Sequence, residues 1–209
     1  MNYFSIFSLP PHLVIDTAAL EKSFYTLSRR LHPDRFAARP AAEQEAALAE
    51  SSRLNDAYRT LRDPIGRTEY LLKLEGIELE EQSRAATDAA KAAGTAKKQV
   101  VPEDLLEEAF ELNMQLEEMR AAKKMGDVGD SGSVDPQLRK DLLAAKSAFD
   151  AKLADADADL AQLHTQWDSA FDANDAARKN AARDAMVALL NRRSYLRNLV
   201  RDVNDALEA

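Results

Sequence analysis

The sequence predicts an all-α protein that consists of an antiparallel helical hairpin followed by a three-helix bundle. Charged residues make up 31% of the 209-residue chain and hydrophobic residues 45%, whereas only 6 Gly and 7 Pro are present. Ala, Leu, Glu, Arg and Lys are abundant, and these residues lose least free energy on entering a helix. Apolar residues also recur at steps of three and four along most of the chain, which is the spacing of one helix face. Composition and periodicity therefore favour the same fold class.

The first long helix is predicted from Asp16, a good N-cap, to about Leu31. Its apolar face repeats at helical spacing and comprises Leu20, Phe24, Leu27 and Leu31. The tripeptide His32-Pro33-Asp34 ends this helix, because proline disfavours helical geometry at the preceding residue and has no N–H to donate.

A second helix is predicted over about 41–62, and Asp63-Pro64 ends it. Its apolar stripe comprises Ala47, Leu54, Tyr58 and Leu61. The two helices form an antiparallel pair joined by a loop. A short third helix follows, and Gly76 is placed to terminate it.

The chain is predicted to divide into a first domain at 1–76, a linker at 77–101 and a three-helix bundle at 102–209. The linker is rich in Ala, Lys, Thr and acidic residues and has no apolar face. In the bundle, the first helix begins near Pro102, and a glycine-rich loop at 126–133 precedes a helix that opens at Asp135-Pro136. That second helix carries a seam to Trp167, which we interpret as a core residue. The last helix, after Asn174-Asp175, has a seam predicted at Ala185, Leu189, Leu196, Val200, Val203 and Leu207.

Charge and residue usage exclude several classes of function. The net charge of −8 argues against nucleic acid as a partner, because neutralising phosphates requires a basic surface. The absence of cysteine removes disulfides, thiol nucleophiles and cysteine ligation of a metal or cluster. The three histidines are scattered without metal-ligand spacing, so no metal site and no cofactor is expected. The apolar start lacks Lys and Arg, and no apolar run is long enough to span a bilayer, so we expect a cytoplasmic protein without a membrane partner.

The loop between the two antiparallel helices carries the decisive motif, His32-Pro33-Asp34, which is the J-domain signature. The tripeptide alone could be interpreted as a loop that merely ends a helix, but the residues around it favour its interpretation as a J-domain signature. That context comprises Tyr3-Phe4, Phe7, Leu9-Pro10, Asn55-Asp56-Ala57-Tyr58, Leu61, Asp63-Pro64, Arg67 and Tyr70-Leu71. Together these residues resemble a J domain of the HscB family. The resemblance is close over 1–76 and continues by architecture over the bundle.

The resemblance implies a co-chaperone of iron–sulfur cluster assembly and not an enzyme. In such proteins the His32-Pro33-Asp34 loop docks between the nucleotide and substrate domains of an HscA/DnaK-type ATPase chaperone and stimulates its ATP hydrolysis. Arg29, Arg30 and Arg35 are expected to contribute to this chaperone-binding site. They belong to a basic run, defined by Lys22, Arg29, Arg30, Arg35 and Arg39, which against Asp34 carries a net +4. A basic run is often only a solvated helix face, but next to this loop we interpret it as a docking surface for an acidic groove.

The first helix of the bundle carries a second candidate binding surface. At about 100° per residue, the core positions of this helix fall within about 40° of one line; they are Leu105, Ala109, Leu112, Leu116 and Met119. Leu106, Phe110 and Met114 lie off that line and form what we call the apolar strip. A further helix covering the strip is the alternative explanation.

In HscB-like proteins this helix contacts an IscU-type iron–sulfur scaffold protein, together with an aromatic residue of the last helix. By position, Leu106, Phe110 and Tyr195 match contact residues, and Glu111 lies on the same side. Glu107 stands where a methionine is common, and Met114 is expected to compensate. The resemblance therefore predicts delivery of the scaffold to the chaperone.

Two alternatives differ in class. A J-domain co-chaperone for other protein clients would bind no iron–sulfur scaffold. An enzyme using His32 and Asp34 would turn over without an ATPase partner, and the lack of a predicted sheet or cofactor motif disfavours it.

Overall fold

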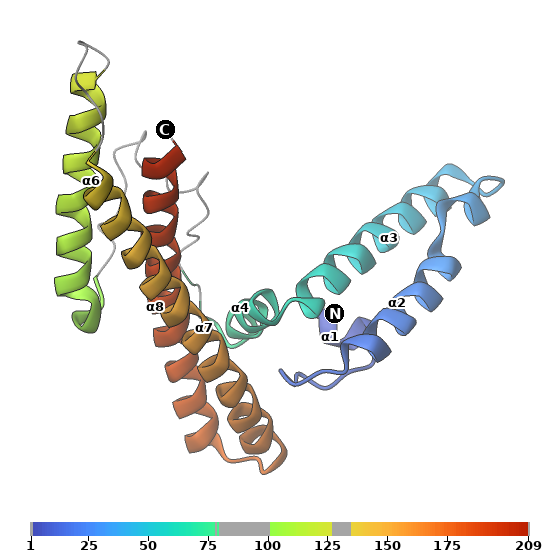
Figure 1. Ribbon diagram of the computed structural model, residues 1–209. Helices are drawn as coiled ribbons and strands as arrows, with labels where there is room; N and C mark the ends of the chain where they lie inside the picture. The colour runs from blue at the N-terminus through green and yellow to red at the C-terminus, as the bar shows by residue number, and fades with distance from the viewer. Residues whose placement is uncertain (1, 78, 80–100, 127–134, 209) are drawn as a thin grey trace. The chain divides into compact units, whose positions relative to one another are not determined.

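The computed structural model describes residues 2–77, 79, 101–126 and 135–208. Within these ranges the regular structure is helical, without strands, as predicted (Figure 1). The predicted linker at 77–101 and the glycine-rich loop at 126–133 lie almost entirely outside the described residues. No helix in the described ranges combines the length and apolarity that crossing a membrane requires.

The contacts divide the chain into two compact units. Unit 1 comprises Met1–Leu79 and Ala161–Met186, and unit 2 comprises Glu80–Leu160 and Val187–Ala209. The two long helices, α7 (Pro136–Asp172) and α8 (Ala176–Glu208), therefore contribute residues to both units.

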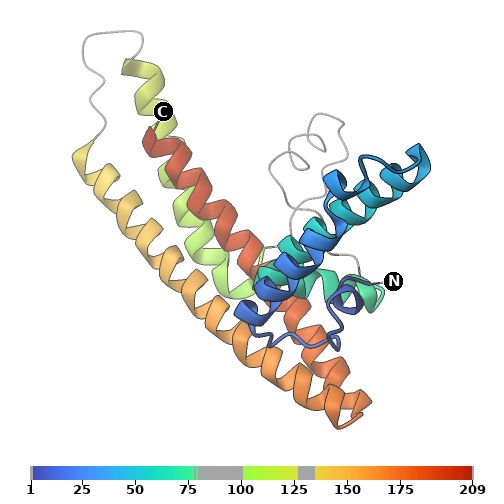
Figure 2. The same cartoon turned by 90° about the vertical axis from the view of Figure 1, so that its right-hand side faces the viewer.

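Unit 1 contains the predicted hairpin, formed by α2 (Thr17–Leu31) and α3 (Ala41–Arg62), which lie side by side in Figures 1 and 2. The predicted N-cap Asp16 accepts hydrogen bonds from the amides of Ala18 and Ala19. Helix α2 ends at Leu31 with His32 as its C-cap, and the chain continues as a short 3-10 helix, η1 (Pro33–Phe36). The sequence prediction missed both this 3-10 turn and the one-turn helix α1 (Tyr3–Ile6), because single turns are too short for a periodic signal.

Helix α4 (Pro64–Leu74) follows α3, and Gly76 terminates it as predicted, two residues after its last residue. Gly76 has φ of +83°, a conformation that residues with a Cβ rarely adopt. Its amide bonds to the carbonyl of Lys73, while the amide of Ile77 bonds to the carbonyl of Leu72. This pair of bonds satisfies carbonyls that the helix end would otherwise leave without donors.

The core of unit 1 is formed by apolar residues of the hairpin, of α4 and of the ends of α7 and α8. Its buried members are Phe4, Phe7, Leu13, Leu20, Ala47, Leu54, Ala57, Leu61, Leu71, Leu72, Trp167, Ala170, Ala182 and Met186. Trp167 is only 1% exposed, and its Nε1 atom donates to the carbonyl of Pro11 at 3.3 Å. The interpretation of Trp167 as a core residue is thus confirmed.

Unit 2 is built from η2 (Glu103–Leu105), α6 (Leu106–Gly126) and the parts of α7 and α8 that belong to it (Figure 2). Its core joins the three helices through Leu105, Ala109, Leu112, Leu116, Met119, Leu138, Leu142, Phe149, Tyr195, Leu196, Leu199, Val203 and Ala206. All five core positions predicted for the first bundle helix are among them. Ion pairs reinforce the packing at the surface, including Lys152 with Glu108 at 2.6 Å.

The predicted seam of the last helix is partly wrong. Ala185 is exposed, and the buried residues near it are Ala182, Met186 and Leu190. The predicted seam is one apolar stripe along the whole helix, whereas α8 belongs to unit 1 up to Met186 and to unit 2 from Val187. One straight stripe therefore does not describe both halves.

Candidate functional site

The docking turn, defined as His32, Pro33 and Asp34, lies between α2 and α3, and its two polar side chains are exposed. The side chain of His32 is 56% exposed and that of Asp34 is 89% exposed. His32 has φ of −59° and ψ of 127°, the extended conformation expected before a proline. Its Nδ1 atom accepts a hydrogen bond from the amide of Asp34 at 3.3 Å, so the imidazole helps to cap the 3-10 turn. The carboxylate of Asp34 is thereby held at a turn that is open to a partner.

The basic run lies beside the docking turn. Arg29 and Arg30 occupy the last turn of α2, and both are exposed. Arg35 is exposed as well, and its Nη1 atom lies 3.4 Å from the carbonyl oxygen of Arg29, which it caps. Among the described residues, no carboxylate forms an ion pair with these three guanidinium groups, so their charge is available to a partner.

Sequence reasoning missed one aromatic residue on this face. Tyr25 is 53% exposed on α2, three residues after Lys22 and four before Arg29. Spacings of three and four residues place side chains on the same side of a helix. The exposure of Tyr25 could have been predicted from the sequence, since this residue falls outside the apolar face that Leu20 and Phe24 define.

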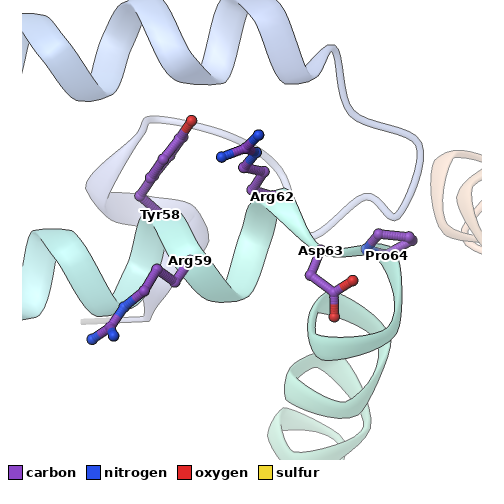
Figure 3. Close-up of a pocket in the computed structure, with 5 residues that line it drawn as sticks. All are labelled: Tyr58, Arg59, Arg62, Asp63 and Pro64. Atoms are coloured by element: carbon purple, nitrogen blue, oxygen red, sulfur yellow. The ribbon is translucent and has the colours of Figure 1, made fainter.

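A pocket of about 360 Å³ opens at the other end of α3, in unit 1 (Figure 3). It is lined by Tyr58, Arg59, Arg62, Asp63 and Pro64. In Figure 3 Arg59 points away from Tyr58 and Arg62, so the cations do not converge. Asp63 is already occupied, because its carboxylate caps α4 by accepting from the amide of Gly66 at 2.7 Å. We therefore assign no ligand to this pocket.

The apolar strip is exposed along α6, as the sequence predicted. Leu106 is 60% exposed, Phe110 67% and Met114 61%. They follow one another at intervals of four residues, which places them on one line of the helix surface. Glu111 is exposed beside them. The strip is a contiguous apolar surface of the kind that marks protein interaction sites.

Tyr195 corrects a prediction about geometry. The seam predicted for its helix does not include Tyr195, but this residue is only 8% exposed and belongs to the core of unit 2. Burial, with a smaller contribution from the charge of Asp202, raises the pKa of its hydroxyl. The predicted seam residues Leu196 and Val203 lie in the same core, so the buried face of α8 in unit 2 is wider than the predicted seam and includes Tyr195. Its ring therefore offers a partner little surface.

A buried polar cluster in unit 1 was not found from the sequence. The hydroxyl of Thr68 donates to the carbonyl of Pro64 at 2.7 Å and lies 2.7 Å from Nε2 of His164. Arg67, only 5% exposed, donates to the carbonyl of Leu61 at 2.8 Å. Burial, followed by the positive charge of Arg67, lowers the pKa of His164 to about 4. Neutral His164 thus serves the packing of α4 and α7.

No group of three or more potential ligands for a metal ion occurs among the described residues. The arrangement that the structure does present is two separate exposed surfaces, the docking turn with the basic run in unit 1 and the apolar strip in unit 2.

Comparison with known proteins connects this architecture to one family. No family model matches the sequence. The chaperone HscB from Vibrio cholerae has a similar structure, with a TM-score of 0.58 and 27% sequence identity over 100% of this chain and 98% of that one. The human co-chaperone protein HscB is similar with a TM-score of 0.57 and 24% identity, over 98% of this chain and 81% of that one, which shows a shared fold. The chain therefore has the fold of HscB-type co-chaperones, and it carries the J-domain signature exposed on its helical hairpin.

Proposed function

We propose that this protein stimulates ATP hydrolysis by an HscA/DnaK-type chaperone and delivers an IscU-type iron–sulfur scaffold protein to it. The observation that carries the proposal is the exposed docking turn, in which the carboxylate of Asp34 stands 89% exposed beside the three arginines of the basic run. The protein itself performs no chemistry in this proposal. It changes the state of the ATPase by binding.

The docking turn acts through charge-assisted hydrogen bonds. An exposed carboxylate competes well for an arginine on the partner, because bidentate pairing with a guanidinium is stronger than a neutral hydrogen bond. Asp34 therefore displaces contacts that hold the chaperone in its slow state. The arginines of the basic run attract an acidic surface of the chaperone and speed the encounter.

The apolar strip receives the scaffold. Three side chains that are 60% to 67% exposed provide the apolar centre of an interface, and the exposed carboxylate of Glu111 offers a pairing site for a basic residue at its rim. With both partners held on one chain, scaffold capture by the chaperone becomes effectively intramolecular. Client delivery and ATP hydrolysis are thereby coupled.

The test is a steady-state ATPase assay of an HscA/DnaK-type chaperone with the full chain, with and without an IscU-type scaffold. We expect the chain to raise turnover and the scaffold to raise it further. No stimulation by the chain would refute the chaperone part of the proposal. Stimulation without any effect or binding of the scaffold would instead favour a co-chaperone for other clients.

A further inference from the structure

We infer that Gln44 is a positioning residue that holds the docking turn in the conformation that the chaperone binds, an inference that rests on the proposed function. The Nε2 atom of Gln44 donates to the carbonyl oxygen of Arg39 at 2.8 Å and lies 3.2 Å from that of Ala37. One side chain of α3 thus hydrogen-bonds to two backbone carbonyls of the segment that joins the docking turn to that helix.

The position of Gln44 in α3 suits this role. It lies in the first turn of the helix, whose N-cap Pro40 provides no side-chain hydrogen bond. The amides of Glu43 and Gln44 both bond to the carbonyl of Pro40, at 2.9 and 3.1 Å, which fixes the backbone from which the side chain extends. Because the donor is anchored in a helix, it restrains the loop carbonyls more firmly than a loop residue would.

The hydrogen bonds within the turn are mostly local. The amide of Arg35 bonds to the carbonyl of His32 at 3.0 Å, and that of Ala37 to the carbonyl of Asp34 at 3.4 Å. Such bonds shape a single 3-10 turn but do not fix its orientation relative to the hairpin. Gln44 supplies that connection on the α3 side, and Arg35, by capping the carbonyl of Arg29, supplies one on the α2 side.

Loss of the Gln44 bonds should appear as weaker docking, not as a lower maximal effect. The apparent dissociation constant equals the intrinsic one divided by the fraction of molecules in the competent conformation. A typical hydrogen bond changes such an equilibrium by about fivefold. At saturation the chaperone selects the competent conformation, so the maximal stimulation is retained.

The experiment compares Gln44→Met with Gln162→Met in the full chain. Methionine matches glutamine in length and helix propensity but removes the donor. Gln162 is an exposed residue of α7, so its replacement controls for the substitution itself. For Gln44→Met we expect the half-saturating concentration in the ATPase assay to rise, by up to about fivefold, at unchanged maximal stimulation. Gln162→Met should match the wild type.

A second measurement examines the free protein. The backbone amides of residues 34–39 should show lower NMR order parameters in Gln44→Met, while the helices and the melting temperature stay unchanged. In Gln44→Glu an accepting carboxylate replaces the donating amide, so this variant should show the same effects. It replaces Gln44→Met in both measurements if the methionine variant folds poorly. Wild-type half-saturation together with unchanged order parameters would overturn the inference. Absence of stimulation by the wild type would instead refute the proposed function, and the order parameters would still decide whether Gln44 orders the turn.

Discussion

The Nε2 atom of His164 in α7 lies 2.7 Å from the hydroxyl oxygen of Thr68 in α4, and both side chains are buried. Because the Thr68 hydroxyl donates to the carbonyl of Pro64, it accepts from the Nε2–H group of a neutral imidazole. Protonation of His164 would place a charge in this buried site close to Arg67. This geometry accounts for the lowered pKa of His164, about 4.

We predict that His164 makes the fold sensitive to acid. Its pKa is about 4 in the folded state and ordinarily 6.5. Between these values the unfolded state binds more protons, so the free energy of unfolding falls as the pH falls, by about 2 kcal/mol. Urea denaturation from about pH 7.5 to about pH 4.5 measures this slope. His164→Gln should flatten it relative to the wild type, and equal slopes for the two proteins would show that His164 does not titrate in this way.

Thr68→Val is predicted to destabilise unit 1 at neutral pH. Valine has nearly the shape of threonine, but it leaves the buried Nε2–H of His164 without an acceptor, which costs about 1–3 kcal/mol. The midpoint of urea denaturation should fall accordingly. Thr165→Val provides a matched control, since Thr165 is exposed on the same helix as His164 and its hydroxyl bonds to the carbonyl of Ala161 within that helix. If both substitutions lower the free energy of unfolding equally, the Thr68–His164 hydrogen bond makes no specific contribution to stability.

For the docking turn, we predict that Asp34→Asn abolishes stimulation of the chaperone ATPase without affecting the fold. Asparagine keeps the shape of the side chain but loses the charge needed for strong pairing with an arginine. Because the Asp34 side chain is 89% exposed, helicity and melting temperature should stay at wild-type values. Asp159→Asn, at an exposed position of α7, is the control and should stimulate normally. Stimulation retained by Asp34→Asn would exclude this carboxylate as the active group.

Much of this architecture could be predicted from the sequence, because local signals determine it. The termination of α4 by Gly76 could be predicted because it depends on the backbone freedom of one residue. The core position of Leu112 could be predicted because it depends on helical spacing. The burial of Tyr195 could not be predicted in this way, because the width of the buried face of α8 depends on what packs against it. The Thr68–His164 bond joins residues 96 positions apart, and the Gln44 bonds depend on the path of a loop. No periodic pattern encodes either.

The basic run is predicted to make docking depend on salt. Exposed charges that steer association are screened as ionic strength rises, so the association rate with the chaperone should fall by on the order of tenfold between low and high salt. Arg30→Glu should lower the rate at low salt and flatten its salt dependence. Lys140→Glu makes the same change in charge at an exposed position of α7 and should lower the association rate much less. Stopped-flow binding measures both, and a flat salt profile for the wild type would contradict the role assigned to the basic run.

The apolar strip is predicted to bind the scaffold without contributing to the core. Leu106→Ala combined with Phe110→Ala should weaken scaffold binding by tenfold or more, about 1.4 kcal/mol or above, because removing exposed anchor side chains takes away the centre of an interface. The melting temperature should change little, since the two side chains are 60% and 67% exposed.

Two control variants make this test of the strip specific. Leu143→Ala removes a side chain that is 47% exposed on α7 and should leave scaffold binding intact. Leu112→Ala removes a core residue and should destabilise unit 2 by about 2–5 kcal/mol. Calorimetric titration of the scaffold, paired with thermal melts, separates the outcomes. If the double substitution melts like Leu112→Ala, the strip belongs to the core; if it binds the scaffold like the wild type, the cargo surface lies elsewhere on the chain.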